Sequence, residues 1–88
     1  MIGSLKVGQY VRALAGRDKG GVFIVVGTAE GGSVYIADGK KRKIETPKKK
    51  KVIHLQKYNR ISEKVSQMAE KGEELSNSLL RSELEGCI

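Results

Sequence analysis

The chain has 88 residues, enough for one small domain, and its 17 Lys and Arg residues against 10 Asp and Glu residues give a net charge of +7. With 39% hydrophobic residues, one Phe and no Trp, it can bury a small core but cannot enclose the cavity that most small-molecule enzymes need. The charge is uneven: residues 1–60 hold 14 basic and 4 acidic residues, a net of +10, whereas residues 61–88 hold 3 and 6, a net of −3. A basic body is followed by an acidic tail, and we expect no small-molecule substrate.

The sequence carries no signal for export, membrane insertion or metal binding. No charged segment followed by an apolar run opens the chain, and no apolar run approaches the length that spans a bilayer. The single cysteine, Cys87, leaves no intrachain disulfide and no set of thiol ligands for zinc. His54 is the only histidine, which excludes a histidine pair and leaves the serines without a base. We therefore expect a cytoplasmic protein with no membrane contact, no catalytic residue, no metal and no cofactor.

The first predicted strand covers residues 6–15, where apolar and other side chains alternate loosely. Val7, Val11 and Ala13 are expected on one side of this strand, and Tyr10 on the other. A tyrosine on a strand either shields the sheet or stacks on an unpaired base, and both interpretations stay open for Tyr10.

A turn and a central strand follow. The segment Gly16 to Gly21 combines three glycines with three charged residues and predicts a tight turn, with Gly16 and Gly20 as its structural residues. Val22–Val26 is continuously apolar and mostly β-branched, which favours a strand covered on both faces at the centre of the sheet. After a glycine-rich break, Val34–Ala37 begins another strand.

A parity argument predicts how the chain turns after Val34–Ala37. A loop of Asp38 and Gly39 alone would point lysines into the core, because side chains alternate between the two faces of a strand. A three-residue loop over residues 38–40, with Gly39 left-handed, pairs Ala37 with Lys41, so that a returning strand covers residues 41–46 and Ile44 is buried. The outer face then presents an aromatic ring flanked by cations: Tyr35, Lys41 and Lys43.

The remaining β-structure is predicted to be short. Pro47 is expected to close the returning strand, because proline cannot donate a ladder hydrogen bond. The run Lys48 to Lys51 is interpreted as a solvated charge run. Val52 to Leu55 predicts a last short strand.

Beyond Tyr58 the apolar spacing changes to that of a helix. The stripe has spacings of four and three residues and consists of Ile61, Val65, Met68, Gly72, Leu75 and Leu79. Asn59 or Ser62 can cap the start of a helix and Gly86 can end it. Because Gly72 lies inside the stripe, we expect a kink or two helices over residues 60–71 and 73–85. The stripe packs on the β-structure or binds another surface, such as a protein partner of the 61–85 helix.

The basic residues gather in few segments. Arg17 and Lys19 lie at the predicted loop tip, and residues 40–43 and 48–51 put eight cations within twelve residues. Their self-repulsion is not compensated nearby, which points to a polyanion, with nucleic acid as the best candidate. His54 is either a wall residue near the rim of the sheet or an RNA contact.

Residues 7–12 and 16–26 resemble the KOW motif of ribosomal and transcription-elongation proteins, in which two strands and a basic loop with a fixed glycine form part of an SH3-like barrel. Gly20 stands at the fixed glycine, whereas Gly21 departs from the basic or larger residue expected next. With the continuations at residues 37–43 and 47–55, the chain resembles, over residues 5–57, a bacterial relative of the large-subunit ribosomal protein fourteen family of archaeal and eukaryotic type.

This resemblance implies a small SH3-like β-barrel over residues 1–57. The acidic tail is not matched by the family, and its apolar spacing adds a C-terminal α-helical segment over residues 58–88, so we expect a mainly β fold. The resemblance also implies an RNA-binding protein, ribosomal or ribosome-associated, that contacts ribosomal RNA through its basic loops. The residues at the family's basic segments are Arg17, Lys19, Lys41, Arg42, Lys43, Lys48, Lys49, Lys50 and Lys51, with His54 at their end. Tyr35 joins them as a candidate for base stacking.

Two alternatives stay open. The chain could be a protein-binding adaptor of the translation or transcription machinery that uses the barrel or the amphipathic helix, although it has only four aromatic residues, one Phe and three Tyr. It could also be a transcription-elongation module. For the RNA-binding interpretation, removal of residues 61–88 is expected to leave RNA affinity unchanged or higher, because net negative charge is removed.

Overall fold

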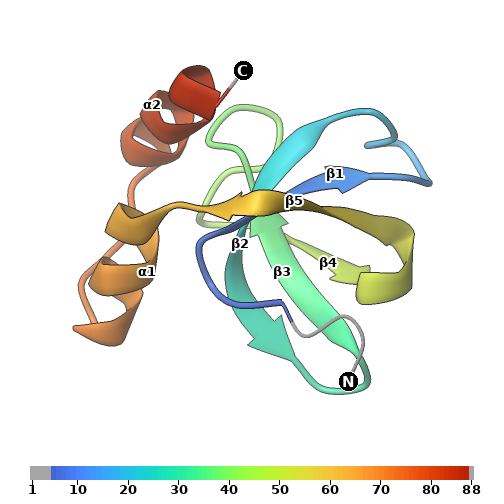
Figure 1. Cartoon of the computed structure of the whole chain (residues 1–88), viewed down its shortest axis with the longest axis horizontal. Coiled ribbons are helices and arrows are strands. Elements are labelled where there is room, and N and C mark those ends of the chain that lie inside the picture. The colour runs from blue at the N-terminus through green and yellow to red at the C-terminus, as the bar shows by residue number, and fades with distance from the viewer. Residues whose placement is uncertain (1–4, 88) are drawn as a thin grey trace.

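A curved antiparallel sheet and two helices make up the fold (Figure 1). The computed structural model describes residues 5–87, with side chains up to residue 86, so the side chain of Cys87 lies outside the described part. The elements are β1 (Gln9–Ala13), β2 (Val22–Ala29), β3 (Ser33–Ala37), β4 (Lys48–Lys51), the 3-10 helix η1 (Val52–His54), β5 (Leu55–Ile61), α1 (Glu63–Glu70) and α2 (Asn77–Cys87). The five strands follow the order β4-β3-β2-β1-β5. The protein is therefore mainly β with a C-terminal helical part.

Strand β2 lies at the centre of the sheet and is covered on both faces, as its apolar sequence predicts. Phe23 and Val25 belong to one hydrophobic cluster, and Ile24 between them belongs to another. Because side chains alternate along a strand, a continuous apolar run fits only such a two-sided environment.

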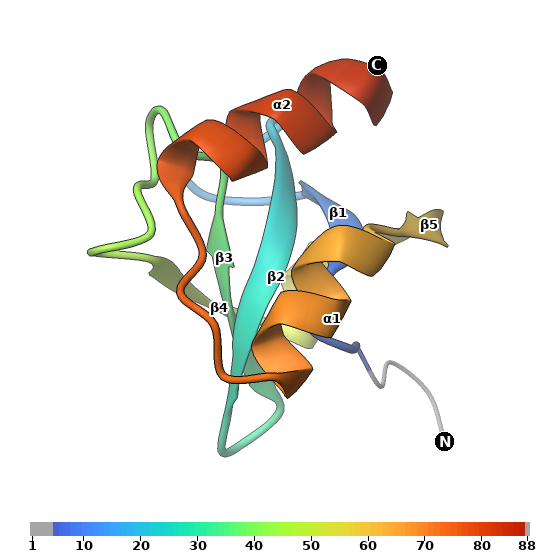
Figure 2. The same ribbon diagram turned by 90° about the vertical axis from the view of Figure 1, so that its left-hand side faces the viewer.

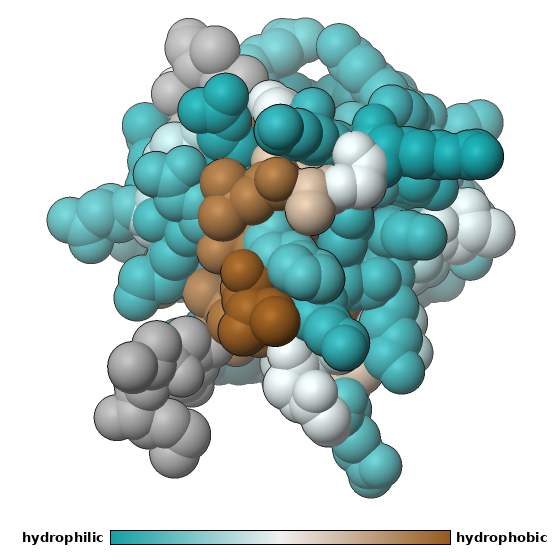
Figure 3. Space-filling view, turned by 90° about the vertical axis from the view of Figure 1, so that its right-hand side faces the viewer, coloured by the Kyte–Doolittle hydropathy of each residue, from teal (hydrophilic) through white to brown (hydrophobic). Residues whose placement is uncertain are grey.

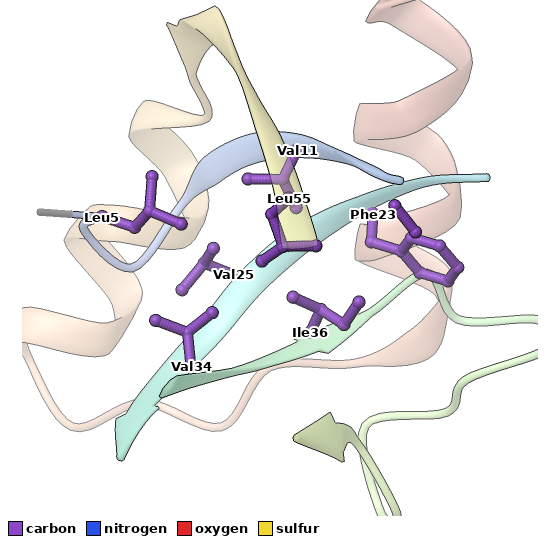
Figure 4. Close-up of a cluster of buried hydrophobic side chains, with 8 residues drawn as sticks. Leu5, Val11, Phe23, Val25, Val34, Ile36 and Leu55 are labelled. Carbon is purple, nitrogen blue, oxygen red and sulfur yellow. The ribbon is translucent and has the colours of Figure 1, made fainter. Parts of the chain in front are cut away.

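The inner cluster fills the concave face of the sheet (Figure 4). Its buried members come from the first three strands, the start of β5 and the segment before β1: Leu5, Val11, Ala13, Phe23, Val25, Val34, Ile36 and Leu55. Strands β4 and β5 lie at opposite edges of the sheet, yet only the three residues of η1 join them. The sheet must therefore curl around this cluster, but no β4–β5 pairing closes it within residues 5–87.

Both helices cover the outer face of the sheet (Figure 2). Val65 of α1 and Leu80 of α2 are fully buried and share a cluster with Tyr10, Ile24 and Ala37 of the sheet. The apolar side of the tail is thus occupied by the protein's own strands.

The helical stripe differs in detail from the prediction. Ile61 is 42% exposed and ends β5 instead of starting a helix. Leu80 and Leu84, which the predicted stripe did not include, are buried in the cluster on the outer face, whereas Leu79, which it did include, is only partly buried. Val7 packs at the edge of this outer cluster, so the prediction that it faces the same side as Val11 was wrong.

The two predicted helices are confirmed, with corrected ends. The hydroxyl of Ser62 caps α1 by accepting a hydrogen bond from the Val65 N–H at 3.2 Å, so Asn59 is not the cap. Gly72 lies between the helices with φ +74°, a left-handed conformation suited to glycine. The hydroxyl of Ser76 accepts from the Leu79 N–H at 3.1 Å at the start of α2. The prediction that Gly86 ends the helix was wrong, because α2 runs through it to its last residue.

Two glycines let the helical part approach the sheet closely. A Cβ at Gly8 would lie 2.7 Å from the carbonyl oxygen of Ser62, and one at Gly39 would overlap the carbonyl oxygen of Asn77. Both glycines also have positive φ, 100° and 79°. A larger residue at either position would push a helix away from the strands.

The predicted strand over residues 41–46 does not form, and residues 38–47 make a loop. The Asp38 carboxylate accepts hydrogen bonds from the backbone N–H groups of Lys40 at 2.9 Å and Arg42 at 2.8 Å, which folds the chain locally. The Ile44 N–H donates to the side chain of Asn77 at 2.7 Å, so it does not join a strand ladder. The predicted left-handed Gly39 is confirmed, but the predicted hairpin was wrong.

The lysine run, which was predicted to be a solvated charge run, forms a strand. Lys48–Lys51 is edge strand β4, paired with β3 so that Lys49 lies opposite Tyr35 and Lys50 opposite Val34. Pro47 precedes this strand, so the prediction that it closes one was wrong. Lys48, Lys49 and Lys51 are exposed on this edge strand, so no alternating apolar pattern was needed to form it.

The last strand is longer than predicted and starts later. Val52 to His54 form η1, and β5 then runs from Leu55 to Ile61, past the expected boundary at residue 57. The pairing of β5 with β1 shifts between Gln9 and Val11, where β5 bulges. The Gln9 side-chain amide donates to the carbonyl oxygens of Tyr58 at 2.6 Å and Arg60 at 2.7 Å. This buried amide replaces strand hydrogen bonds that the bulge removes.

Candidate nucleic-acid interface

The β1–β2 loop presents two exposed cations on a tight backbone. The N–H groups of Gly20 and Lys19 donate to the carbonyls of Ala13 at 2.8 Å and Gly16 at 3.2 Å. Gly16 and Gly20 have φ +81° and +89°, so the prediction of both as turn residues is confirmed. The side chains of Arg17 and Lys19, between these glycines, are exposed at the loop tip.

A buried carboxylate joins this loop to the loop over residues 38–47. Only 1% of the Asp18 side chain is exposed, and its oxygens accept from Arg42 Nε at 3.1 Å and Nη2 at 3.0 Å. The Lys41 ammonium lies 3.9 Å from the same carboxylate. Such a two-pronged pair fixes both position and angle of the guanidinium. Segments 24 residues apart in sequence are therefore held together.

The charge of Asp18 is maintained by its neighbours. Burial by itself would raise the pKa of this carboxyl, but the hydrogen bond and charge of Arg42, helped by Lys41 and Lys50, outweigh burial and lower the pKa below its ordinary value. Asp18 is therefore ionised at neutral pH, and Arg42 is largely committed to it. The Arg42 guanidinium, one of the predicted RNA-binding groups, is therefore used to hold the fold together.

Strand β4 reaches the same end of the molecule. Lys50 is half-buried, and its ammonium donates to the carbonyl of Ala15 at 2.9 Å. The Lys41 ammonium donates to the carbonyl of Arg17 at 3.4 Å. Cations from the β1–β2 loop, the 38–47 loop and β4 therefore converge, although they are far apart in sequence.

The other predicted residues extend this basic surface. Lys43 is exposed on the 38–47 loop. His54 is also exposed and lies beside the β1–β2 loop, because its carbonyl accepts a hydrogen bond from the Leu14 N–H at 2.9 Å. The remaining exposed lysines lie along β4 and are Lys48, Lys49 and Lys51. Because side chains alternate along a strand, these lysines point to both faces of the edge.

The two tyrosines proposed for stacking have different surroundings. Tyr10 is 3% exposed, and its hydroxyl donates to the carbonyl of Glu83 at 3.0 Å, so of the two open interpretations it takes that of a core residue and not that of a base-stacking residue. Tyr35 is half-buried and lies opposite Lys49 in the β3–β4 register, not beside Lys41 and Lys43 as predicted. The combination of an aromatic ring and cations exists, but with lysines of β4.

Helix α2 holds the 38–47 loop from the other side. Arg81 Nη1 donates to the carbonyl of Gly39 at 2.6 Å, and Asn77 bonds both the Ile44 N–H and, at 2.9 Å, the Glu45 carboxylate. The hydrogen bond from Asn77 is the main cause of the lowered pKa of Glu45.

Sequence reasoning did not single out Asp18, Asn77 or Arg81. Asp18 did carry a signal, because it is the acidic residue inside the basic turn, between Arg17 and Lys19. Asn77 and Arg81 carried none, because their partners lie 33 and 42 residues earlier in the sequence.

Within residues 5–87 no three His, Cys, Asp or Glu residues are grouped so that they could hold a metal ion. Neither of the described α-helices is long and apolar enough to cross a membrane. Among known proteins, no family model matches the chain and no curated protein matches its sequence.

Proposed function

We propose that this protein is an RNA-binding module of the KOW type, built on an SH3-like barrel, that binds structured ribosomal RNA as a ribosomal or ribosome-associated protein of the cytoplasm. The observation that carries the proposal is the convergence of cations from two loops and β4 around the buried Asp18 carboxylate. A fixed set of exposed ammonium and guanidinium groups on one end of a small domain suits the phosphate backbone of RNA.

The arrangement favours recognition of RNA shape. The cations lie on segments held by backbone and side-chain hydrogen bonds, as in the bond from Lys50 to Ala15. Phosphate contacts position a nucleic acid without reading its sequence, and double-stranded RNA is recognised largely in this way. Arg17 and Lys19 at the loop tip and the exposed lysines of β4 are the proposed phosphate contacts.

The adaptor alternative has less support. Its amphipathic helix would need a free apolar side, but Val65, Leu80 and Leu84 are buried against the strands. A protein partner would therefore have to bind the sheet or its loops, where the exposed surface is rich in lysine. Capture of partners from a lysate with and without nuclease separates the two functions: loss on nuclease treatment supports RNA, and retention supports an adaptor.

Salt dependence of binding to a structured RNA hairpin tests the proposal directly. The logarithm of the affinity should fall with the logarithm of salt concentration, by roughly one unit of slope for each neutralised phosphate. Replacing Arg17 and Lys19 with glutamine should reduce this slope by about two units.

The matched control replaces Lys64 and Lys71, exposed residues of the helical part, with glutamine. It removes the same charge away from the proposed interface. Equal effects of the two double variants would show that net charge alone drives binding, and would contradict a localised interface.

A further inference from the structure

Two large apolar side chains are exposed next to the basic surface. Ile53 is 78% exposed and Leu14 is 46% exposed, and the third exposed large hydrophobic among the described residues, Ile61, lies at the end of β5. The segment η1, which contains Ile53, lies at the right of Figure 1. Figure 3 shows that face, with apolar residues across its centre and hydrophilic residues on both sides.

The backbone holds Ile53 outward. The N–H of Val52 donates to the carbonyl of Gly32 at 2.9 Å, and the carbonyl of His54 accepts from the Leu14 N–H at 2.9 Å. Val52 itself packs against the inner cluster. Both neighbours of Ile53 are thus fixed, so its exposure is a property of the folded chain and not of a loose end.

Cations adjoin this apolar pair. Lys51 directly precedes η1, and the Lys50 ammonium bonds the carbonyl of Ala15, the residue after Leu14. The same loop continues to Arg17, whose carbonyl accepts from Lys41. A ligand that covers Ile53 and Leu14 therefore also meets positive charge.

We propose that Ile53 and Leu14 contact the face of an unpaired base while the neighbouring lysines bind the phosphates beside it. An unpaired nucleotide combines an apolar face with a negative charge, which is the combination this surface complements. The inference rests on the proposed RNA binding and adds a specificity: the protein prefers structured RNA that contains an unpaired nucleotide over a continuous duplex.

The test compares two RNAs, a fully paired duplex and the same duplex with a single-nucleotide bulge. The wild-type protein should bind the bulged RNA about fivefold more tightly, the gain expected from partial burial of one or two aliphatic side chains. Ile53→Ser should abolish this preference and leave duplex affinity and salt slope unchanged. Ile61→Ser, a matched control at another isoleucine that is exposed in the described part of the chain, should leave the preference and the duplex affinity unchanged.

The outcomes separate this inference from the proposed function. Equal, salt-dependent binding of both RNAs by the wild type overturns the base contact and leaves RNA binding intact, whereas no salt-dependent binding of either RNA overturns the proposed function itself. If Ile53→Ser retains the preference, or instead removes a nuclease-resistant protein partner, the patch does not serve a base. Thermal unfolding of each variant checks that it is folded.

Discussion

The outer face of the sheet and its loop end, where the β1–β2 loop and the 38–47 loop meet around Asp18, are stabilised in different ways. On the outer face, Val65, Leu80 and Leu84 exclude water from the strands. At the loop end, the Asp18 carboxylate organises cations that stay near water. The 38–47 loop belongs to both regions, since Arg42 ties it to Asp18 and Asn77 ties it to α2. The acidic tail therefore helps to shape the basic surface, although its own net charge is negative.

The largest expected effect comes from the outer face. Leu80→Ala should lower the free energy of unfolding by about 3 kcal/mol, because it leaves a cavity at a fully buried position between α2 and the strands. Chemical denaturation measures this loss. Leu79→Ala, at a partly buried neighbour, should cost about 1 kcal/mol. Equal losses would mean that α2 is not seated on the sheet by Leu80.

The second-largest loss of stability is expected at the loop end, from a change at Asp18. Asp18→Asn should lower the free energy of unfolding by about 2 kcal/mol, because the part-buried hydrogen bonds from Arg42 lose their ionised acceptor. Glu30→Gln removes the same charge at an exposed position and should change stability by less than about 0.5 kcal/mol. A stable Asp18→Asn variant would show that the carboxylate does not hold the two loops together.

Lowering the pH should gradually remove the stability that the ionised Asp18 carboxylate contributes. Because the folded-state pKa of Asp18 is lowered, its ionisation stabilises the fold above the unfolded pKa of about 3.9 and loses this effect as the pH falls through the folded value. The stability difference between wild type and Asp18→Asn should therefore be constant near neutral pH and shrink below about pH 4. Denaturation series at several pH values measure it, and a difference that persists in acid would contradict the assignment.

The smallest effect tests the link between the two regions. Asn77→Ala removes the hydrogen bonds to Ile44 and Glu45 without changing the net charge. It should weaken the proposed RNA binding about threefold, because the 38–47 loop becomes less ordered. Asn59→Ala, an exposed asparagine on β5, is the control.

This prediction reverses the expectation for the tail from charge alone, which is that its loss leaves affinity unchanged or higher. Faster hydrogen exchange at the Ile44 amide with unchanged affinity would show that loop order is irrelevant to binding. Unchanged exchange and affinity together would mean that Asn77 does not restrain the loop.

Sequence patterns predicted the parts of the fold that depend on local chemistry. The two-sided strand at Val22–Val26, the glycine turn after β1 and the break between helices at Gly72 all follow from the residues present. The parity argument for the segment after Ala37 failed because it assumed a strand, whereas Asp38 and Asn77 satisfy that backbone with side chains. Strand β4 was missed because its lysines carry no apolar alternation.

The residues of the candidate site could be predicted from the sequence, but their arrangement in space could not. Arg17, Lys41 and Lys50 could be chosen from charge alone, whereas their convergence depends on tertiary contacts. The burial of Tyr10 and Asp18 likewise depends on elements far along the chain, α2 for Tyr10 and the 38–47 loop for Asp18.

The all-lysine composition of β4 has a consequence for how copies of this protein meet. One side of β4 pairs with β3, while its other side is a sheet edge with backbone groups available to a strand from another molecule. Two such edges would place eight lysine residues close together, four from each copy. Their repulsion opposes edge-to-edge pairing, so the lysines of β4 protect the protein electrostatically against self-association through this edge.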